Sequence, residues 1–258
     1  MGNILDAIVK SRKISLAEAQ KRLPISAIKS KLKKIPPPLD FERAVSKKPY
    51  SIIGEIKKSS PTHGRILKRF SPGDLAGIYK RAGVSAISIL TEEKHFGGST
   101  DDILKVKEKT GLPVLRKDFI FSEYQIYESR YFRADAVLLI ARILGKKKLA
   151  ELFNLTVKLG MTPLVEIYGM KDIAKLNGLR ISLLGINTRD LATGKINKSK
   201  AGELAKKVKA KVLVCESGMK NRKDIDEMRN LGFNSFLVGT SILKSGNKFV
   251  FIRGLLEN

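Results

Sequence analysis

The feature that most constrains this chain is a series of eight short runs rich in Val, Ile and Leu, separated by longer amphipathic segments. The runs start 21 to 33 residues apart, which leaves room for one strand, one helix and two short loops each. They cover residues 51–57, 84–92, 113–119, 136–143, 162–168, 183–190, 212–218 and 235–241. Such alternation is typical of a parallel sheet. Eight βα units predict an α/β fold, a (β/α)8 TIM barrel, with an open doubly wound sheet as the alternative.

The segment 71–83 illustrates the helices between these runs. Ser71 is placed to cap a helix whose first turn holds Pro72, and Gly83 is placed to end it. Apolar residues at i, i+3, i+4 and i+7 from Leu75 form one stripe that can pack on the strands.

The first 50 residues differ from the rest, with two helix-like stretches, the turn-prone KIPPPLD at 34–40 and no clear strand. Barrels of this type often span about 250 residues as one unit. We therefore interpret 1–258 as a single (β/α)8-barrel domain, of which 1–50 is a helical N-terminal extension.

The charge balance favours anionic partners, because 50 Lys and Arg against 25 Asp and Glu leave a formal charge of +25. Phosphate esters and nucleic acids both fit this charge. A nucleic-acid binder gathers its charge on one patch with a recognisable motif, whereas these lysines are spread over nearly every expected helix. We expect a small-molecule ligand and no nucleic acid.

Other compositional features narrow the setting. Cys215 is the only cysteine, which excludes an intrachain disulfide and a cysteine-rich metal site. No apolar run approaches the roughly 18 residues of a membrane span, and the N-terminus lacks a secretory pattern. We expect a cytoplasmic monomer that binds no membrane, metal or cofactor.

Charged residues lie at the carboxyl ends of the first, third, fifth and seventh expected strands. Glu55 and Lys57 share a face near the end of the first run; the others are Lys117, Glu166 and Glu216. Alternate strands of a barrel contribute one layer of the lumen, and active sites lie at the carboxyl ends of the strands. The pattern predicts that Lys57 and Lys117 face Glu166 and Glu216 in one lumen, where such clusters perform general acid–base chemistry. Solvated strand ends are the alternative interpretation.

Further polar and glycine residues follow the later strands. Asn187 and Arg189 end the sixth strand and suit a carboxylate or hydroxyl group. The loops after strands seven and eight contain Ser217, Gly218, Gly239 and Thr240, and barrels often bind phosphate with the backbone of these two loops. Ordinary turn glycines are the alternative.

Some residues are ambiguous or point elsewhere. Phe96, Phe119 and Leu138 either line a ring pocket or pack in the core. His63 is expected to be solvated, and Cys215, out of phase with Glu216, is expected to face the helices as a small hydrophobe.

Six of these segments, read in order, resemble the indole-3-glycerol-phosphate synthase family. They are GEIKKSSP (54–61), SILTEEKHFGGS (88–99), VLRKDF (114–119), VEI (165–167), GINTRDL (185–191) and CESG (215–218). The resemblance implies an enzyme of tryptophan biosynthesis. Its substrate would be the sugar phosphate 1-(2-carboxyphenylamino)-1-deoxyribulose 5-phosphate, which is cyclised, decarboxylated and dehydrated without a cofactor or metal.

The resemblance also implies a role for each residue of the site. Lys117 would protonate the ketose carbonyl, Glu166 and Lys57 would serve later proton transfers, Glu55 and Glu216 would orient these groups, and Asn187 would bond near the reacting centre. Ser60 and Arg189 would make carboxylate and polar contacts. Ser217, Gly218, Gly239 and Thr240 would bind the phosphate, and Phe96, Phe119 and Leu138 would line the anthranilate ring.

Three other functions compete with this interpretation. A related sugar-phosphate barrel, phosphoribosylanthranilate isomerase, is expected to use a Cys and Asp pair, against which Lys117 and Glu166 argue. A basic nucleic-acid-binding protein would show salt-dependent binding of DNA or RNA. An inactive barrel conflicts with the intact Lys57, Lys117 and Glu166.

Overall fold

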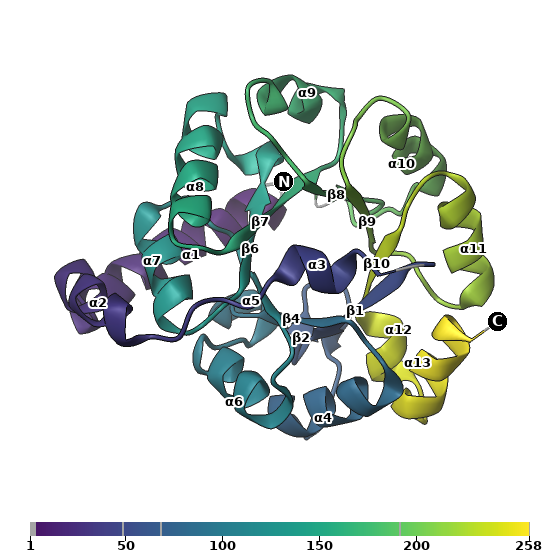
Figure 1. Cartoon of the computed structure of the whole chain (residues 1–258), viewed down its shortest axis with the longest axis horizontal. Helices are drawn as coiled ribbons and strands as arrows, with labels where there is room; N and C mark the ends of the chain where they lie inside the picture. The colour runs from purple at the N-terminus through teal and green to yellow at the C-terminus, as the bar shows by residue number, and fades with distance from the viewer. Residues whose placement is uncertain (1–3, 48, 68, 191, 258) are drawn as a thin grey trace.

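Eight parallel strands close into a barrel in this computed structural model, which describes residues 4–47, 49–67, 69–190 and 192–257 (Figure 1). The barrel strands are β1 (Ser51–Ile56), β4 (Ala86–Leu90), β5 (Val114–Lys117), β6 (Ala136–Ile140), β7 (Thr162–Ile167), β8 (Leu183–Asn187), β9 (Val212–Glu216) and β10 (Ser235–Val238). Their order around the barrel is β1-β10-β9-β8-β7-β6-β5-β4, with β4 pairing again with β1. The predicted barrel is confirmed, and the open sheet is wrong.

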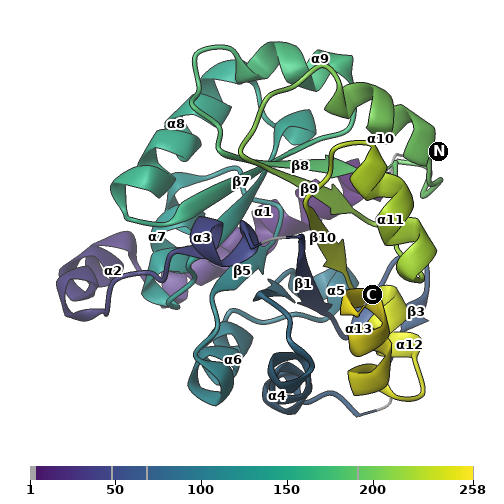
Figure 2. The same ribbon diagram turned by 45° about the vertical axis from the view of Figure 1, so that its right-hand side comes forward.

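Helices surround the barrel on its outer side (Figures 1 and 2). They are α4 (Pro72–Ala82), α5 (Glu93–Phe96), α6 (Asp101–Thr110), α7 (Glu123–Tyr131), α8 (Lys146–Lys158), α9 (Met170–Ile173), α10 (Lys198–Ala205), α11 (Arg222–Asn230), α12 (Thr240–Lys244) and α13 (Lys248–Leu256). Short 3-10 turns occur at Leu32–Lys34, Ala141–Ile143 and Ala174–Leu176, and β2 (Ser59–Ser60) pairs with β3 (Gly64–Arg65) in a hairpin after β1.

The helix α4 begins and ends where the sequence predicts. Gly83 adopts the left-handed conformation, with φ of 98°, that lets glycine end a helix without strain. Ser71 lies at the N-cap position, but its hydroxyl donates to the Asp74 carboxylate at 2.7 Å instead of accepting a backbone bond. The predicted side-chain cap is therefore wrong, because the Ser71 hydroxyl is turned toward the Asp74 side chain and not toward the backbone N–H groups of the first turn.

Two apolar layers follow from the alternation of side chains along each strand. Ile53, Leu115, Leu164 and Val214 fill the lumen. Their neighbours Ile52, Val165 and Cys215 face the surrounding helices. Cys215 is buried in that outer layer, as its phase predicts.

The N-terminal extension is helical and contacts both ends of the barrel. α1 (Ile4–Arg22) places Leu5 and Ile8 beside the carboxyl ends of the strands. α2 (Ile25–Lys31) packs on α7, and α3 (Phe41–Val45) lies at the amino end, where the Ser51 hydroxyl donates to the Val45 carbonyl (Figure 1). None of the helices in the described residues is long and apolar enough to cross a membrane.

Candidate active site

A cavity of about 540 Å³ opens at the carboxyl ends of the strands. The residues predicted for the site all line it: Glu55, Lys57, Ser60, Phe96, Lys117, Phe119, Leu138, Glu166, Asn187, Arg189, Glu216, Ser217, Gly218, Gly239 and Thr240. Leu5 and Ile8 of α1 contribute to the same wall. Closure of the barrel thus gathers residues from strands that are far apart in the chain, whereas the role of each residue stays a prediction. Leu191, the last residue of the GINTRDL motif, lies outside the described residues.

Lys117 lies between two buried carboxylates. Its Nζ is 2.9 Å from Glu166 Oε2 and 2.6 Å from Glu216 Oε2. Burial disfavours the charged amine, but Glu166 and Glu216 outweigh it and raise the pKa of Lys117 well above its usual value. The amine is therefore a stable cation that carries a proton into the cavity.

The carboxyl group of Glu216 has a strongly raised pKa. Burial and the nearby Glu166 raise its pKa to about 8, and Lys117 only partly opposes them. Its Oε1 is buried and has no hydrogen-bond partner among the described residues. This oxygen occupies the space beside Gly185, where a Cβ atom would lie only 2.1 Å from it.

Lys57, directly after β1, pairs with Glu55 of that strand at 2.5 Å and not with Glu166 or Glu216. Lys57, Lys117, Glu166 and Glu216 all line this one cavity, and the ion pairs within it join Lys57 to Glu55 and Lys117 to Glu166 and Glu216. Burial would raise the pKa of Glu55, but Lys57 and Lys117 hold it below the usual value. The site thus holds two ion-paired groups in one cavity, close enough for Lys117 to act on Glu55.

Asn187 and Arg189 form a polar wall after β8. Asn187 is buried, and its Oδ1 accepts from the Arg189 backbone N–H at 3.0 Å. The Arg189 guanidinium donates to the Gly194 carbonyl at 2.9 Å, so the loop holds it at the rim. Ser60 is buried in the β2–β3 hairpin, and its hydroxyl accepts from the His63 backbone N–H at 3.2 Å.

The two glycine loops after β9 and β10 both border the cavity. Ser217 and Gly218 adopt positive φ values of 67° and 80°. Thr240 begins α12, so free N–H groups of its first turn lie beside Gly239. At Gly239 a Cβ would lie 2.3 Å from Glu55 Oε1, which makes glycine necessary for this close approach.

An apolar wall forms another side of the cavity. The rings of Phe96 and Phe119 lie 6.1 Å apart at a tilt of 34°, and Leu138, Leu5 and Ile8 pack with them. A flat aromatic ring fits such a surface. His63 is exposed at the rim, as predicted, and partial desolvation together with nearby cations lowers its pKa.

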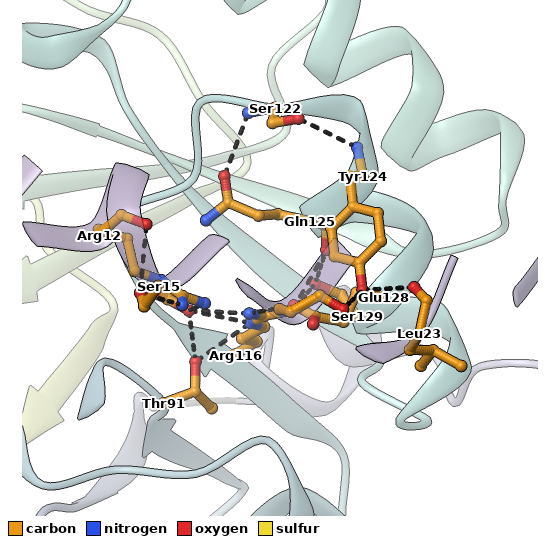
Figure 3. Close-up of polar contacts among 12 residues, drawn as sticks. Arg12, Ser15, Leu23, Thr91, Arg116, Ser122, Tyr124, Gln125, Glu128 and Ser129 are labelled. Carbon is orange, nitrogen blue, oxygen red and sulfur yellow. Dashed lines mark hydrogen bonds and ion pairs between the residues drawn. The ribbon is translucent and has the colours of Figure 1, made fainter. Parts of the chain in front are cut away.

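The sequence interpretation missed a buried charge network directly behind Lys117. It joins Arg12 of α1, Thr91 after β4, Arg116 of β5 and Asp118. Figure 3 shows the Arg12, Thr91 and Arg116 side chains converging on one another, with Gln125, Glu128 and Ser129 of α7 beyond them. Two signals were available: Arg116 is a charge on the helix-facing side of a strand, and Arg12 interrupts the apolar stripe of α1.

No group of three or more His, Cys, Asp or Glu side chains within the described ranges is arranged to hold a metal ion. The fold and the site together define a (β/α)8 barrel with a charged, partly apolar pocket where enzymes of this architecture carry their catalytic residues.

Comparison with known proteins identifies the family. The profile described as "Indole-3-glycerol phosphate synthase" matches residues 5–255, and the chain belongs to this family, whose members are carboxy-lyases of tryptophan biosynthesis. The chain is 40% identical to the indole-3-glycerol phosphate synthase of Dehalococcoides mccartyi over 98% of this chain and 100% of that one. It is 42% identical to that of Aquifex aeolicus over 84% and 85%.

A solved structure, 3-hexulose-6-phosphate synthase from Salmonella typhimurium, superposes with a TM-score of 0.64 over 80% of this chain and 96% of that one. At 13% sequence identity this similarity shows the fold alone. The prediction of family and function is confirmed by the closer relatives, and the isomerase alternative is wrong.

Proposed function

We propose that this chain converts 1-(2-carboxyphenylamino)-1-deoxyribulose 5-phosphate into indole-3-glycerol phosphate, carbon dioxide and water, with Lys117 as the acid of the first step. The observation that carries this proposal is the position of the Lys117 cation between Glu166 and Glu216 in a cavity that also has an aromatic wall. A proton donor, two carboxylates and a ring surface are the groups that this reaction requires.

Ring closure comes first. The aromatic carbon that bears the carboxylate attacks the ketose carbonyl carbon, and a C–C bond forms as the C=O π bond breaks. The oxygen becomes an alkoxide and takes the proton of Lys117. An alkoxide is a strong base, so even an amine with a raised pKa can protonate it. The cation also stabilises the charge that develops on this oxygen.

Decarboxylation and dehydration follow. Loss of carbon dioxide leaves its bonding electrons in the ring and restores aromaticity. The new hydroxyl then leaves as water after protonation, and the adjacent CH2 carbon of the new ring loses a proton as the indole double bond forms. Glu166 and Lys57 serve the protonation of the leaving hydroxyl and the removal of the ring proton. Both line the cavity, and the partner of opposite charge that each has holds it in place there.

The remaining residues hold the substrate. Ser60 and Arg189 contact its carboxylate and polar groups, and Asn187 bonds near the reacting carbon. Glu55 and Glu216 orient the two lysines. Phe96, Phe119 and Leu138 hold the anthranilate ring.

Phosphate binds at the loops after β9 and β10, on Ser217, Gly218, Gly239 and Thr240. Support comes from the positive φ values of Ser217 and Gly218, from the start of α12 at Thr240 and from the place of all four residues in the cavity lining, since backbone N–H groups of such turns commonly bind phosphate. In the barrel order β9 and β10 lie across from β5, which Phe119 follows, and β6, which carries Leu138 of the ring wall. The substrate would therefore span the cavity.

The wider properties of the chain complete the proposal. We take it to act as a single domain and a monomer in the cytoplasm, without cofactor or metal and without nucleic acid as a partner. The dispersed positions of its 50 Lys and Arg residues support a solvated basic surface.

A direct assay tests this function. Purified protein mixed with the anthranilate-bearing ribulose phosphate should produce indole absorbance and release one carbon dioxide per turnover. Absence of both products from correctly folded protein would contradict the proposed reaction.

A further inference from the structure

The Asp118 carboxylate is the centre of a fully buried hydrogen-bond network. It accepts six hydrogen bonds: from Arg12 Nε and Nη2, Arg116 Nε and Nη2, the Thr91 hydroxyl and the Phe119 backbone N–H. Burial would raise the pKa of Asp118, but Arg12 and Arg116 hold it well below its usual range. A carboxylate so engaged is a fixed point in the fold.

Arg12 reaches this point from the N-terminal extension. Its side chain lies on the stripe of α1 that also buries Leu5, Ile8 and Leu16, and only 3% of it is exposed. Both of its contacts to Asp118, at 2.8 and 3.0 Å, use the bidentate geometry that a guanidinium and a carboxylate favour. A buried charge is costly unless paired, so α1 is held in one orientation over the barrel.

The residues next to this network belong to the site. Asp118 lies between Lys117 and Phe119 in sequence, and the Thr91 backbone N–H donates to the Lys117 carbonyl at 3.1 Å. Thr91 thus ties the ends of β4 and β5 together through both its backbone and its hydroxyl.

A second path leads from α1 to Phe96. The Ser11 hydroxyl lies 3.0 Å from His95 Nε2, and the buried Glu92 accepts from the backbone N–H groups of His95 and Phe96 at 2.7 and 3.0 Å. The helix α1 therefore contacts the segments that carry both rings of the apolar wall, and adds Leu5 and Ile8 to that wall itself.

We propose that Arg12 is a positioning residue for the reaction, which through Asp118 fixes α1 and the Lys117–Phe119 segment so that the aromatic wall fits the anthranilate ring. This inference rests on the proposed function. Arg12 of the N-terminal extension is thus expected to affect binding of the anthranilate ring, whereas phosphate binds on the other side of the cavity and should be unaffected. A misplacement of about 1 Å far from the chemistry can cost roughly 100-fold in rate, so the effect should be large.

The test compares three variants of the full chain. Arg12→Met removes both bonds to Asp118, which keeps Arg116, Thr91 and the Phe119 N–H as partners, so the variant should fold. Arg12→Lys keeps the charge and one bond. Lys13→Met is the matched control, because it removes an exposed charge from the next position of the same helix.

Arg12→Met should lower kcat/KM about 10- to 100-fold. The Kd of a reduced substrate analogue, in which the carbonyl is an alcohol, should rise about tenfold, while the Kd of inorganic phosphate changes less than about twofold. Arg12→Lys should recover most of the loss, and Lys13→Met should match the unmodified chain. In an Asp118→Asn background, Arg12→Met should have little further effect, because the pair acts as one unit.

Two results would overturn the proposal. One is an Arg12→Met chain with unchanged kcat/KM and analogue affinity. The other is an Arg12→Met chain in which the affinities for phosphate and for the analogue fall by the same factor while the Tm also falls. That result indicates a merely structural role. Absence of turnover in the unmodified chain would contradict the proposed reaction and leave the role of Arg12 open to test. The Kd values of the reduced analogue and of inorganic phosphate in the same variants would then decide that role.

Discussion

Single side chains decide how protons move in this site, and Lys117 is the most informative of them. Its bonds to Glu166 and Glu216 keep it charged, so its proton is present whenever the carbonyl oxygen needs it. We expect Lys117→Met to lower turnover by at least about 10²-fold, within the 10²–10⁴-fold range of general acid catalysis. Inorganic phosphate should bind as before. Single-turnover ring closure measures the effect, and near-native closure would move the acid role to Lys57.

Glu216 gives a prediction in pH. Its pKa of about 8 leaves it neutral below that value, when the group of Lys117, Glu166 and Glu216 carries no net charge. Above pH 8 this group becomes negative, which repels an anionic substrate and makes Lys117 a weaker acid. We expect kcat/KM to fall as pH rises through about 8, and Glu216→Gln, which stays neutral, to lose this step. A step that persists in the variant would assign it to another group.

The same shift has a consequence for stability. A carboxyl whose pKa is raised in the folded state contributes stability below its ordinary value of 4.5 and loses it as pH rises to about 8. The stability of Glu216→Gln relative to the unmodified chain should therefore improve between pH 4 and pH 8, as measured by urea unfolding.

At the scale of elements, strand β8 makes room in the site because Gly185 has no side chain. Gly185 pairs in register with Glu166, and its missing side chain leaves the space that Glu216 Oε1 occupies. In Gly185→Ala the new Cβ would lie 2.1 Å from that oxygen, so the Glu216 carboxyl group must shift, which disturbs its bond to Lys117. We expect kcat to fall about 10- to 100-fold, and stability to fall by about 1–3 kcal/mol from overpacking.

A helical glycine provides the control for this substitution. Gly254 of α13 has open space around its Cβ position, so Gly254→Ala should leave kcat unchanged and stabilise the chain by up to about 1 kcal/mol. A Gly185→Ala chain as active as Gly254→Ala would show that the position of Glu216 does not matter for the reaction.

At the scale of the whole molecule, the formal charge of +25 acts through self-repulsion. Charges repel one another over about 30 Å at 0.01 M salt, but salt screens this repulsion beyond about 8 Å at 0.15 M. We expect the Tm to rise by a few degrees over this range, and any binding to DNA or RNA to vanish at the higher salt. Scanning calorimetry and a mobility-shift assay measure these effects, and tight binding to a defined nucleic acid at 0.15 M would contradict the second.

Local regularities of the sequence determined the barrel and placed the charged residues of the site at the ends of its strands. Strands and helices have fixed periods, so the phase of Lys117, Glu166 and Glu216 along their own strands already directed them into the lumen. Parallel strands place all their carboxyl ends together, which is why residues spread over most of the chain line one cavity.

Only the tertiary structure decided which charges pair. Arg12 and Asp118 are 106 residues apart, and the local sequence pattern around either residue does not indicate that the other is its partner. The same holds for the pairing of Lys117 with Glu216 and for the space that Gly185 leaves. These contacts depend on distances of a few ångströms across the closed barrel. Periodicity sets the face on which a side chain lies, but barrel closure and the seat of α1 set the atoms that it meets.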